Sequence, residues 1–400
     1  MILSVDNNQL IYLVGEPNLE AKYHPFEPYN ELVCTFLSDL SFELLASENT
    51  KLYPDIAYFA FWCRKANIAK LKADFEDGKS RLGLGLVFHI APANVPINFA
   101  FSFVFGLLSG NANVVRVPSK AFPQVDIVCS AIENLFNLEK YSEIKSMNAF
   151  IRYEQNDDIT GMFSSKCNAR IIWGGDATIR NIRKLSIPER SIEITFADRY
   201  SFCVLEAASI SKLKDNELRQ FAEQFYNDTY LMDQNACSSP HLIIWLGEGK
   251  DFAKEKFWEN VHEIVKEKYK LETVSVVDKY TKLCHDAIEV SDCNFKRHGN
   301  SIYRISLNIL SNDIDKFRGK CGYFYEFSTN EINNIAHIVN TKYQTLTYFG
   351  VDKQQLLDFV IKNRLLGVDR IVPVGKALDI GVIWDGYDII KALSRIIDVR

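Results

Sequence analysis

The stretch from Leu82 to Ser119 constrains the fold more than any other part of the chain. Residues 82–92, LGLGLVFHIAP, read as a buried strand, and a short turn leads from it into the apolar helix INFAFSFVFGLLSG. Gly110 stands where a glycine usually ends a helix, and NANVVRVPS then supplies a second strand. A hydrophobic helix that crosses between two strands predicts an α/β fold with a parallel sheet covered on both faces.

Amphipathic helices are predicted on both sides of this unit, because apolar residues recur there at helical spacing. They are expected at residues 32–45, 56–75, 125–136 and 252–270. Asp55 is a candidate N-cap for the second of them. Residues 364–400 are expected to finish the chain as a loop and an amphipathic helix.

A Gly-Gly turn follows the strand ARIIW, residues 169–173, and leads into a further helix. Glycines let backbone N–H groups approach a phosphate closely, and the dipole of the following helix adds a favourable potential. Gly174 and Gly175 are therefore a candidate anion site. The alternative is a simple tight turn, because the segment has no GxGxxG pattern.

A cysteine lies in a polar turn between a helix and a strand in YNDTYLMDQNACSSPHLIIWL, residues 226–246. One apolar face indicates the preceding helix, formed by Leu218, Phe221, Ala222, Phe225 and Thr229. Pro240 prevents the helix from continuing, and residues 242–246 read as a buried strand. Backbone N–H groups in such a turn stabilise a thiolate and an oxyanion, so Cys237 is the candidate nucleophile.

The alternative for Cys237 is an ordinary structural cysteine, since most unpaired cysteines behave as small buried hydrophobes. The chain contains nine cysteines, scattered singly and without a CxxC pair. This pattern argues for a reducing, cytoplasmic compartment, and against both a disulfide framework and a zinc site. We therefore expect no metal.

The overall composition excludes several classes of partner. A net charge of −5, with basic residues mixed among acidic ones, gives no attraction to nucleic acid or to an anionic membrane. The longest apolar stretch, Ile97 to Leu108, is too short to span a bilayer. The first residues have no basic leader before an apolar run, so no signal peptide is expected.

Five motifs occur in an order that resembles the aldehyde dehydrogenase superfamily. They are PANVP (92–96), GNANVVRVPS (110–119), WGGDATI (173–179), EITFADRYS (193–201) and DQNACSSP (233–240). The resemblance is closer to the acyl-CoA (fatty acyl) reductase branch of bacterial luminescence systems, of which VDRIVPVGKALDIGVIWDGYD (368–388) is also typical. It covers about residues 80 to 400.

The resemblance implies an aldehyde dehydrogenase-like fold, with a Rossmann-type parallel-sheet cofactor domain and an α/β catalytic domain. The cofactor-binding domain is expected at residues 1–203, of which 1–80 form an N-terminal part of helices and strands. The catalytic domain that bears the nucleophile is expected at residues 204–370. Residues 371–400 are expected to pack back on the cofactor domain or on a neighbouring subunit.

The resemblance also implies catalytic roles. Cys237 matches the family nucleophile, which would attack an acyl thioester and expel CoA. Asn94 matches the oxyanion-hole asparagine, and its alternative role is that of a turn residue capping the next helix. Glu193 matches the family's glutamate base, but Thr195 and Phe196 stand where the family has glycines. A structural strand-end glutamate is the alternative, because a reductase that releases aldehyde needs no hydrolytic water.

The cofactor-binding residues are carried over in the same way. The residues that match the family's nucleotide-binding segments are Ile90, Ala91, Pro92, Arg116, Ser119, Lys120, Gly174 and Gly175. Ser119-Lys120 lies where many NAD-specific members have Ser-Glu, whose carboxylate holds the adenosine ribose. A lysine at that place, with Arg116 near it, would pair with a 2′-phosphate and favours NADPH over NADH.

The leading hypothesis is therefore an NADPH-dependent acyl-CoA or acyl-enzyme reductase that forms a fatty aldehyde. The alternatives are a reductase of another activated acyl group, an aldehyde dehydrogenase, and a non-redox cysteine acyltransferase or acyl-binding subunit. The luminescence-type relatives work with an acyl-transferring synthetase, so a similar partner is expected from the resemblance, as is a homo-oligomer.

Overall fold

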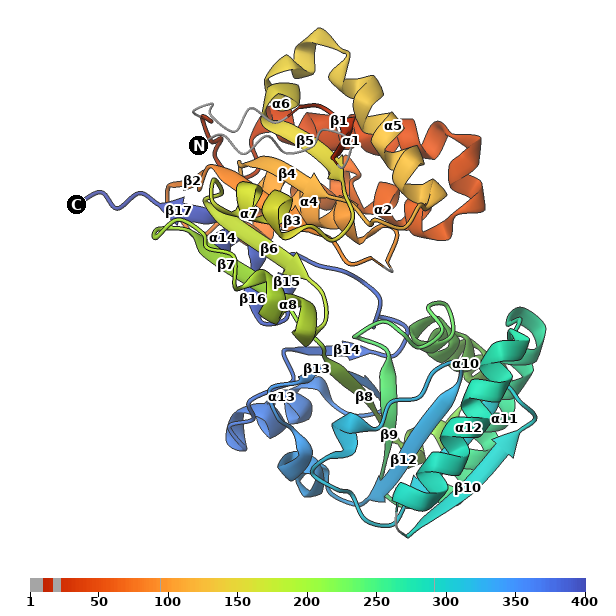
Figure 1. Cartoon of the computed structure of the whole chain (residues 1–400). Coiled ribbons are helices and arrows are strands. Elements are labelled where there is room, and N and C mark those ends of the chain that lie inside the picture. The colour runs from red at the N-terminus through yellow and green to blue at the C-terminus, as the bar shows by residue number, and fades with distance from the viewer. Residues whose placement is uncertain (1–9, 17–22, 94, 291) are drawn as a thin grey trace. The chain divides into compact units, whose positions relative to one another are not determined.

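The chain forms two compact units in a computed structural model that describes residues 10–16, 23–93, 95–290 and 292–400 (Figure 1). The first unit comprises Met1–Ala197 together with Tyr387–Arg400, and the second comprises Asp198–Gly386. The last residues of the chain thus belong to the same unit as the first. Which unit binds a cofactor and which carries out catalysis stays a prediction.

The described part of the first unit contains a six-stranded sheet in the order β1-β5-β4-β3-β6-β7. Its strands are β1 (Ile11–Val14), β3 (Leu86–Ile90), β4 (Ala112–Arg116), β5 (Asn148–Arg152), β6 (Ala169–Trp173) and β7 (Ile192–Phe196). Only the edge strand β1 is antiparallel to its neighbour among these described strands. The predicted parallel sheet is confirmed.

Helices of the first unit cover this sheet. They are α1 (Glu31–Ala46), α2 (Pro54–Trp62), α3 (Lys65–Phe75), α4 (Asn98–Leu108), α5 (Pro123–Phe136), α6 (Ser142–Met147), α7 (Asp157–Ser164), α8 (Asp176–Ile182) and α14 (Ile389–Ala392). The crossover helix α4 is apolar all round because it has neighbours on both sides. Phe103 packs on Phe150 of β5, with ring centroids 4.8 Å apart, while Phe101 and Phe105 pack on Trp62 of α2.

Two predictions for the first unit are wrong in detail. Residues 56–75 form two helices, α2 and α3, because Arg64 is extended and the side chain of Asn67 donates to the carbonyl of Trp62 at 2.7 Å. Asp55 is not the N-cap of α2. Tyr53 takes that place, since Pro54 is the first helical residue and has no N–H to satisfy.

The strand predicted at 82–92 is divided by Gly85, whose φ of +130° is open to glycine alone. The short strand β2 (Arg81–Gly83) leaves the main sheet and pairs antiparallel with β17 (Ser394–Ile396). Most of the helix predicted near the C-terminus is thus replaced by the four-residue α14 and by β17.

The described part of the second unit contains a seven-stranded sheet in the order β10-β11-β12-β9-β8-β13-β14. Its strands are β8 (Tyr200–Glu206), β9 (Pro240–Leu246), β10 (Cys293–His298), β11 (Ile302–Leu307), β12 (Tyr323–Thr329), β13 (Tyr343–Phe349) and β14 (Arg370–Pro373). All pairs are parallel except that of the edge strand β10. Strands β7 and β8 follow each other in the sequence but belong to different units.

Helices of the second unit are α9 (Ala207–Lys212), α10 (Asp215–Thr229), α11 (Lys250–Lys268), α12 (Thr273–Glu289) and α13 (Lys353–Lys362). The sheet is buried on both faces, as parallel sheets are. On one face Ile243 and Trp245 of β9 pack with α10 and α11, and on the other Leu242 and Ile244 enter a second apolar cluster. No helix among the described residues is long and apolar enough to cross a membrane.

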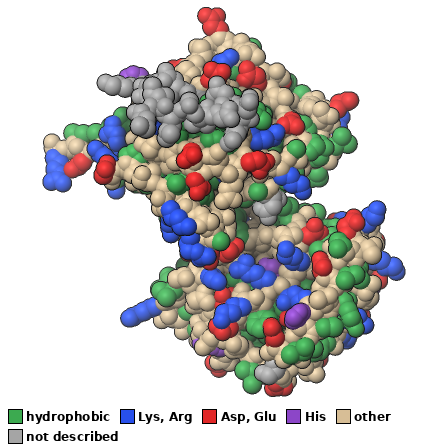
Figure 2. All heavy atoms as spheres, viewed as in Figure 1, with side chains coloured by type: hydrophobic (Ala, Val, Ile, Leu, Met, Phe, Trp, Pro, Cys, Tyr) green, Lys and Arg blue, Asp and Glu red, His purple; other side chains and the backbone are tan. Residues whose placement is uncertain are grey.

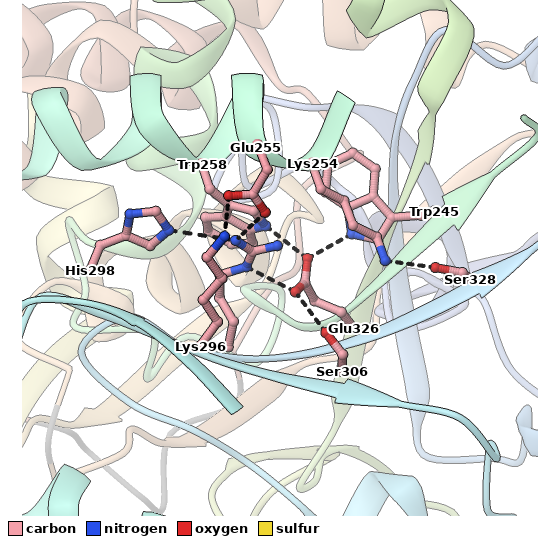
Figure 3. Close-up of polar contacts among 10 residues, drawn as sticks. Trp245, Lys254, Glu255, Trp258, Lys296, His298, Ser306, Glu326 and Ser328 are labelled. Carbon is pink, nitrogen blue, oxygen red and sulfur yellow. Dashed lines mark hydrogen bonds and ion pairs between the residues drawn. The ribbon is translucent and has the colours of Figure 1, made fainter. Parts of the chain in front are cut away.

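The core of the second unit also contains a buried carboxylate, Glu326 of β12 (Figure 3). One oxygen accepts the indole N–H groups of Trp245 and Trp258, each at 2.7 Å. The other accepts Nε of the equally buried Arg304 at 2.9 Å. A buried charge is tolerated when its oxygens are all hydrogen-bonded and a cation is paired with it, as here.

We predict that Glu326→Leu destabilises the protein by roughly 3–5 kcal/mol, because Arg304 then loses its buried partner and two indoles lose their acceptor. Urea unfolding followed by tryptophan fluorescence measures the loss. The double variant Glu326→Leu/Arg304→Met should recover much of it, since apolar side chains of similar volume replace a buried ion pair at little cost. Equal losses in the single and double variants would contradict this account.

Candidate active site

The candidate nucleophile Cys237 lies in the turn between α10 and β9, as predicted. The residues expected on the inner face of α10 are all buried: Leu218, Phe221, Ala222, Phe225 and Thr229. Strand β9 is buried along its whole length and begins at Pro240. The helix, the polar turn and the buried strand predicted around Cys237 are thus confirmed, whereas its chemical role is untested.

The side chain of Gln234 connects this turn to the start of β12 through hydrogen bonds. Its side chain is fully buried and donates through Nε2 to the carbonyls of Pro240 and Tyr323, at 3.0 and 3.1 Å. Its Oε1 accepts the N–H groups of Gly322 and Tyr323, at 3.2 and 3.1 Å. All the hydrogen-bonding capacity of the amide is used, which holds Gln234 in a left-handed conformation with φ of 61°.

Two serines hold the backbone closer to the sulfur. Ser239 donates to the carbonyl of Asp228 at 2.7 Å, which ties the end of the turn to the end of α10. Ser201 donates to the carbonyl of Cys237 at 2.7 Å and accepts the N–H of Thr345 at 3.2 Å. Cys237 is thereby fixed at the amino ends of three neighbouring parallel strands, β8, β9 and β13.

The thiol of Cys237 is protonated at neutral pH. Burial, with a smaller effect of the Asp385 carboxylate, raises the pKa of Cys237 to about 11, against the lowering effects of Gln344 and Arg199. Cys237 as a whole residue is partly exposed, while its thiol lies in surroundings that disfavour charge. A thiol in this state needs a partner that takes its proton or stabilises its charge during attack.

His241, four residues after Cys237, does not supply a positive charge that would stabilise a Cys237 thiolate. It is buried and stacks on Tyr200, with ring centroids 5.5 Å apart. Burial, assisted by the nearby Arg318, lowers the pKa of His241 to about 3. The ring is neutral at physiological pH, so it cannot stabilise a thiolate electrostatically.

Glu193 lies in β7 of the first unit, where both its carboxylate oxygens are occupied. Oε2 accepts Nε of the buried Arg170 at 2.9 Å, and Oε1 accepts Nε of Arg183 at 2.7 Å. Arg170 further donates to Ser164 Oγ and to the carbonyl of Leu185, at 3.0 and 2.9 Å. A carboxylate engaged by two guanidinium groups favours the structural alternative for Glu193.

Asn94, matched to the oxyanion-hole asparagine, lies outside the described residues. Its role stays a prediction.

The residues matched to the cofactor site lie at the carboxyl ends of adjacent strands in the first unit. Ile90 ends β3 and pairs with Arg116 at the end of β4 and with Ile172 of β6. The chain proceeds from β3 through β4 to β5 on one side, and returns to β6 and β7 on the other. Ligands of open parallel sheets bind at the carboxyl ends where the strand order reverses in this way.

The glycine turn lies at the same edge of the sheet. Gly174 follows β6, and Gly175 is the N-cap of α8. A Cβ on Gly174 would come within 3.2 Å of Thr178, so the turn leaves little room for a side chain. Close approach of backbone is what a phosphate contact requires, and a tight turn explains it equally.

The basic residues of the set differ in their surroundings. The guanidinium of Arg116 lies 4.4 Å from the centroid of the Tyr153 ring and donates to the Tyr153 carbonyl at 3.2 Å. Ser119 is half-buried. Lys120 is exposed, with Nζ 5.2 Å from the ring of Phe122. Lys120 is therefore the more accessible of the two cations for a ligand phosphate.

Arg199, Gln344 and Asp385 surround Cys237, and none of them was found from the sequence. Arg199 belongs to the motif EITFADRYS and Asp385 to the C-terminal motif, so two of the three lie in segments with a recognisable pattern. These motifs were the only signal in the sequence that pointed to Arg199 and Asp385. The motifs could not assign a role to either residue, because positions 199, 344 and 385 come together only in the folded unit.

The fold is that of aldehyde dehydrogenases. A NAD-dependent benzaldehyde dehydrogenase from Corynebacterium glutamicum is similar with a TM-score of 0.62 at 12% identity, covering 99% of this chain and 98% of that one. The NADP complex of glyceraldehyde-3-phosphate dehydrogenase GapN from Methanocaldococcus jannaschii gives 0.62 at 15%, covering 92% and 88%. A lactaldehyde dehydrogenase gives 0.64 at 9%, covering 91% and 85%.

The family follows from the sequence comparison. The sequence model of the acyl-CoA reductase (LuxC) family matches residues 69–280, which is more than half of the chain. The protein therefore belongs to the acyl-CoA reductase (LuxC) family, and the resemblance drawn from its motifs is confirmed. A search of curated proteins finds no match.

We predict that Glu193→Gln chiefly affects stability, lowering it by about 3 kcal/mol, since it breaks a largely buried ion pair with Arg170. Thermal unfolding measures this loss, and Arg183→Ala, which removes the exposed partner, should cost about 1 kcal/mol or less. The turnover of the folded variant at saturating substrate should stay near that of the wild type. A loss of about a hundredfold or more with unchanged stability would instead indicate a general base.

Proposed function

We propose that the protein reduces a fatty acyl thioester to an aldehyde with NADPH, through an S-acyl intermediate on Cys237. The observation that carries this proposal is the placement of Cys237, in a member of the acyl-CoA reductase family, on a turn that Gln234, Ser239 and Ser201 hold rigid. A nucleophile needs such fixed placement, because an error of about 1 Å costs much of the rate.

In the first half-reaction the sulfur of Cys237 attacks the acyl carbonyl carbon, and the carbon–sulfur bond to CoA breaks. The proton of the Cys237 thiol leaves with the CoA thiol, so an acyl-cysteine thioester replaces the acyl-CoA thioester without change of charge. The side chain of Asn94 and the backbone N–H of Cys237 are proposed to receive the oxyanion that forms during attack.

In the second half-reaction the acyl carbon on Cys237 is reduced. A reduced nicotinamide cofactor, held by residues such as Gly174, Gly175 and Lys120, would supply the hydride. The resulting thiohemiacetal on Cys237 collapses to the aldehyde as its carbon–sulfur bond breaks. Cys237 leaves as a thiolate and regains a proton. No water enters this sequence, which agrees with a Glu193 engaged by two arginines.

The cofactor is proposed to bind at the carboxyl ends of β3, β4 and β6. Ile90, Ala91 and Pro92 would lie along the dinucleotide, and Gly174 and Gly175 would approach its phosphates. Ser119, Lys120 and Arg116 would face the adenosine ribose. The exposed Lys120 supports NADPH, because an ammonium group pairs with a 2′-phosphate. A homo-oligomer and an acyl-transferring partner stay predictions from the family.

We predict that acyl-CoA adds one acyl group to the intact wild-type protein and that Cys237→Ala abolishes the adduct. Intact-protein mass spectrometry measures the adduct, and NADPH added afterwards should discharge it to aldehyde. Cys284→Ala is the matched control, because Cys284 is exposed and lies on α12, outside the turn that carries Cys237. It should acylate like the wild type.

The other outcomes of this experiment would indicate a different activity or reject the proposed function. An adduct that neither NADPH nor NADH discharges would indicate an acyltransferase. An adduct formed only from acyl phosphate would indicate a different acyl donor. No adduct from any donor would remove the proposed function.

We predict that Lys120→Glu raises the KM for NADPH by about tenfold and leaves the KM for NADH nearly unchanged, since one charged contact to the 2′-phosphate is lost. Steady-state kinetics with both coenzymes measure this. Lys51→Glu reverses the charge of an exposed lysine elsewhere in the first unit and should change neither constant. A parallel loss with both coenzymes would contradict a 2′-phosphate contact.

A further inference from the structure

Strand β13 contains a bulge at its amino end. Its pairing with β8 runs from Tyr343 opposite Tyr200 to Leu346 opposite Phe202, so three steps along β13 face two along β8. Gln344 and Thr345 are the residues within this irregularity, and both are buried. A bulge turns side chains away from their regular alternation, and bulges are frequent beside active sites.

The side chain of Gln344 is hydrogen-bonded to an acid and acts on the thiol of Cys237. Its Nε2 donates to Asp385, and the Gln344 side chain lowers the pKa of the Cys237 thiol, against the larger effect of burial. Its Oε1 accepts the hydroxyl of Thr345 at 3.3 Å. An amide has two N–H donors on a single nitrogen. With one N–H on Asp385 and the oxygen on Thr345, the second N–H is the group left for the sulfur.

Asp385 is held in place as firmly as Gln344. Its side chain is 5% exposed, and its φ of 49° is uncommon for a residue with a Cβ. Nε of Arg199 lies 3.9 Å from Oδ1. Arg199 also pairs with Asp369 and donates to the carbonyl of Thr341 at 2.8 Å. Asp385 and Arg199 are the charged groups that act on the Cys237 thiol.

The same bulge also holds the backbone of Cys237. Ser201 accepts the N–H of Thr345 and donates to the Cys237 carbonyl. The carbonyl of Cys237 is thus connected through Ser201 to Thr345, the residue that follows Gln344 in β13. A displacement of this strand end would move the nucleophile with it.

We propose that Gln344 and Asp385 are positioning residues of the nucleophile: Gln344 donates a hydrogen bond to the sulfur of Cys237, and Asp385 orients the Gln344 amide for it. This inference rests on the proposed function, in which Cys237 is the nucleophile.

The two residues act on the sulfur in opposite directions. The Gln344 N–H stabilises negative charge on sulfur, whereas the carboxylate of Asp385 opposes it. Cys237 therefore stays a thiol at rest. When the thiohemiacetal collapses, the sulfur departs with the electron pair of the carbon–sulfur bond, and the Gln344 N–H is in place to receive that charge.

The test is the pH dependence of Cys237 alkylation by iodoacetamide in the full chain, read from the Cys237 peptide by mass spectrometry. Only the thiolate reacts, so the wild-type rate should rise about tenfold per pH unit from neutral toward the pKa of about 11. Asp385→Asn should lower the pH at the midpoint of this rate dependence by about one pH unit, and Gln344→Met should raise it by a similar amount.

Controls separate this effect from a loss of structure. Gln344→Glu removes both amide donors, keeps the shape of the side chain, and should also raise the midpoint, which covers a poorly folded Gln344→Met. Asp369→Asn neutralises the other carboxylate on Arg199 and should leave the midpoint unchanged. The peptide of the exposed Cys284 serves as an internal reference in every sample.

Shifts in the same direction for Asp385→Asn and Gln344→Met, or no shift in either, would overturn the inference. Alkylation needs no acyl donor, so its outcome is independent of the adduct experiment. Opposite shifts of the alkylation midpoint without an acyl adduct would support the roles of Gln344 and Asp385 and reject the proposed function. An acyl adduct without shifts of the midpoint would support the proposed function and reject the roles of Gln344 and Asp385.

Discussion

The hydrogen bonds of Gln234 are the constraint on which the candidate site depends. A turn between a buried helix face and a buried strand brings polar backbone into the core, and that backbone needs partners. Gln234 supplies them to Pro240, six residues away, and to Gly322 and Tyr323, which are 88 and 89 residues away. Together with the pairing of β9 with β12 and the hydrogen bond from the Cys321 N–H to the Asp233 carbonyl, this amide fixes the turn relative to β12.

Each sheet contains a further buried polar link between its strands. In the first unit, Ser102 of α4 lies between Trp173 and His89, and His89 in turn contacts Asn113 of β4 at 2.9 Å. Burial lowers the pKa of His89 to about 4, so this series of hydrogen-bonded side chains carries no charge at neutral pH. In the second unit the link is charged and centres on Glu326. Both links join residues of different elements through directed hydrogen bonds, which apolar packing alone does not provide.

The sequence predicted those parts of the fold in which apolar periodicity matches burial. The inner face of α10 and the apolar helix α4 are of this kind, and their strand neighbours follow the parallel pattern. Helix α12, which the sequence analysis did not predict, is the opposite case. Its buried residues are Lys279 and Asp286, while Val277 and Ile288 are exposed. Lys279 donates to carbonyls such as that of Cys321 at 2.6 Å, so polar contacts dock this helix and an apolar pattern could not find it.

The candidate site divides in the same way. The position of Cys237 in a turn between a helix and a strand was predictable, because it follows from a local pattern. Gln344 and Asp385 are 41 residues apart, and their contact depends on a bulge that no local pattern encodes. Glu193 shows the converse, since its motif suggested chemistry while its arginine partners, Arg170 and Arg183, became evident only when β6, α8 and β7 were placed side by side.

A resting thiol at Cys237 has a consequence for the lifetime of the protein in the presence of peroxide. Oxidation to sulfenic acid requires the thiolate, and further oxidation is irreversible. With a pKa of about 11, only about one Cys237 in a thousand is ionised at pH 8. The environment that keeps the Cys237 thiol protonated thus also protects the sulfur from oxidation by peroxide.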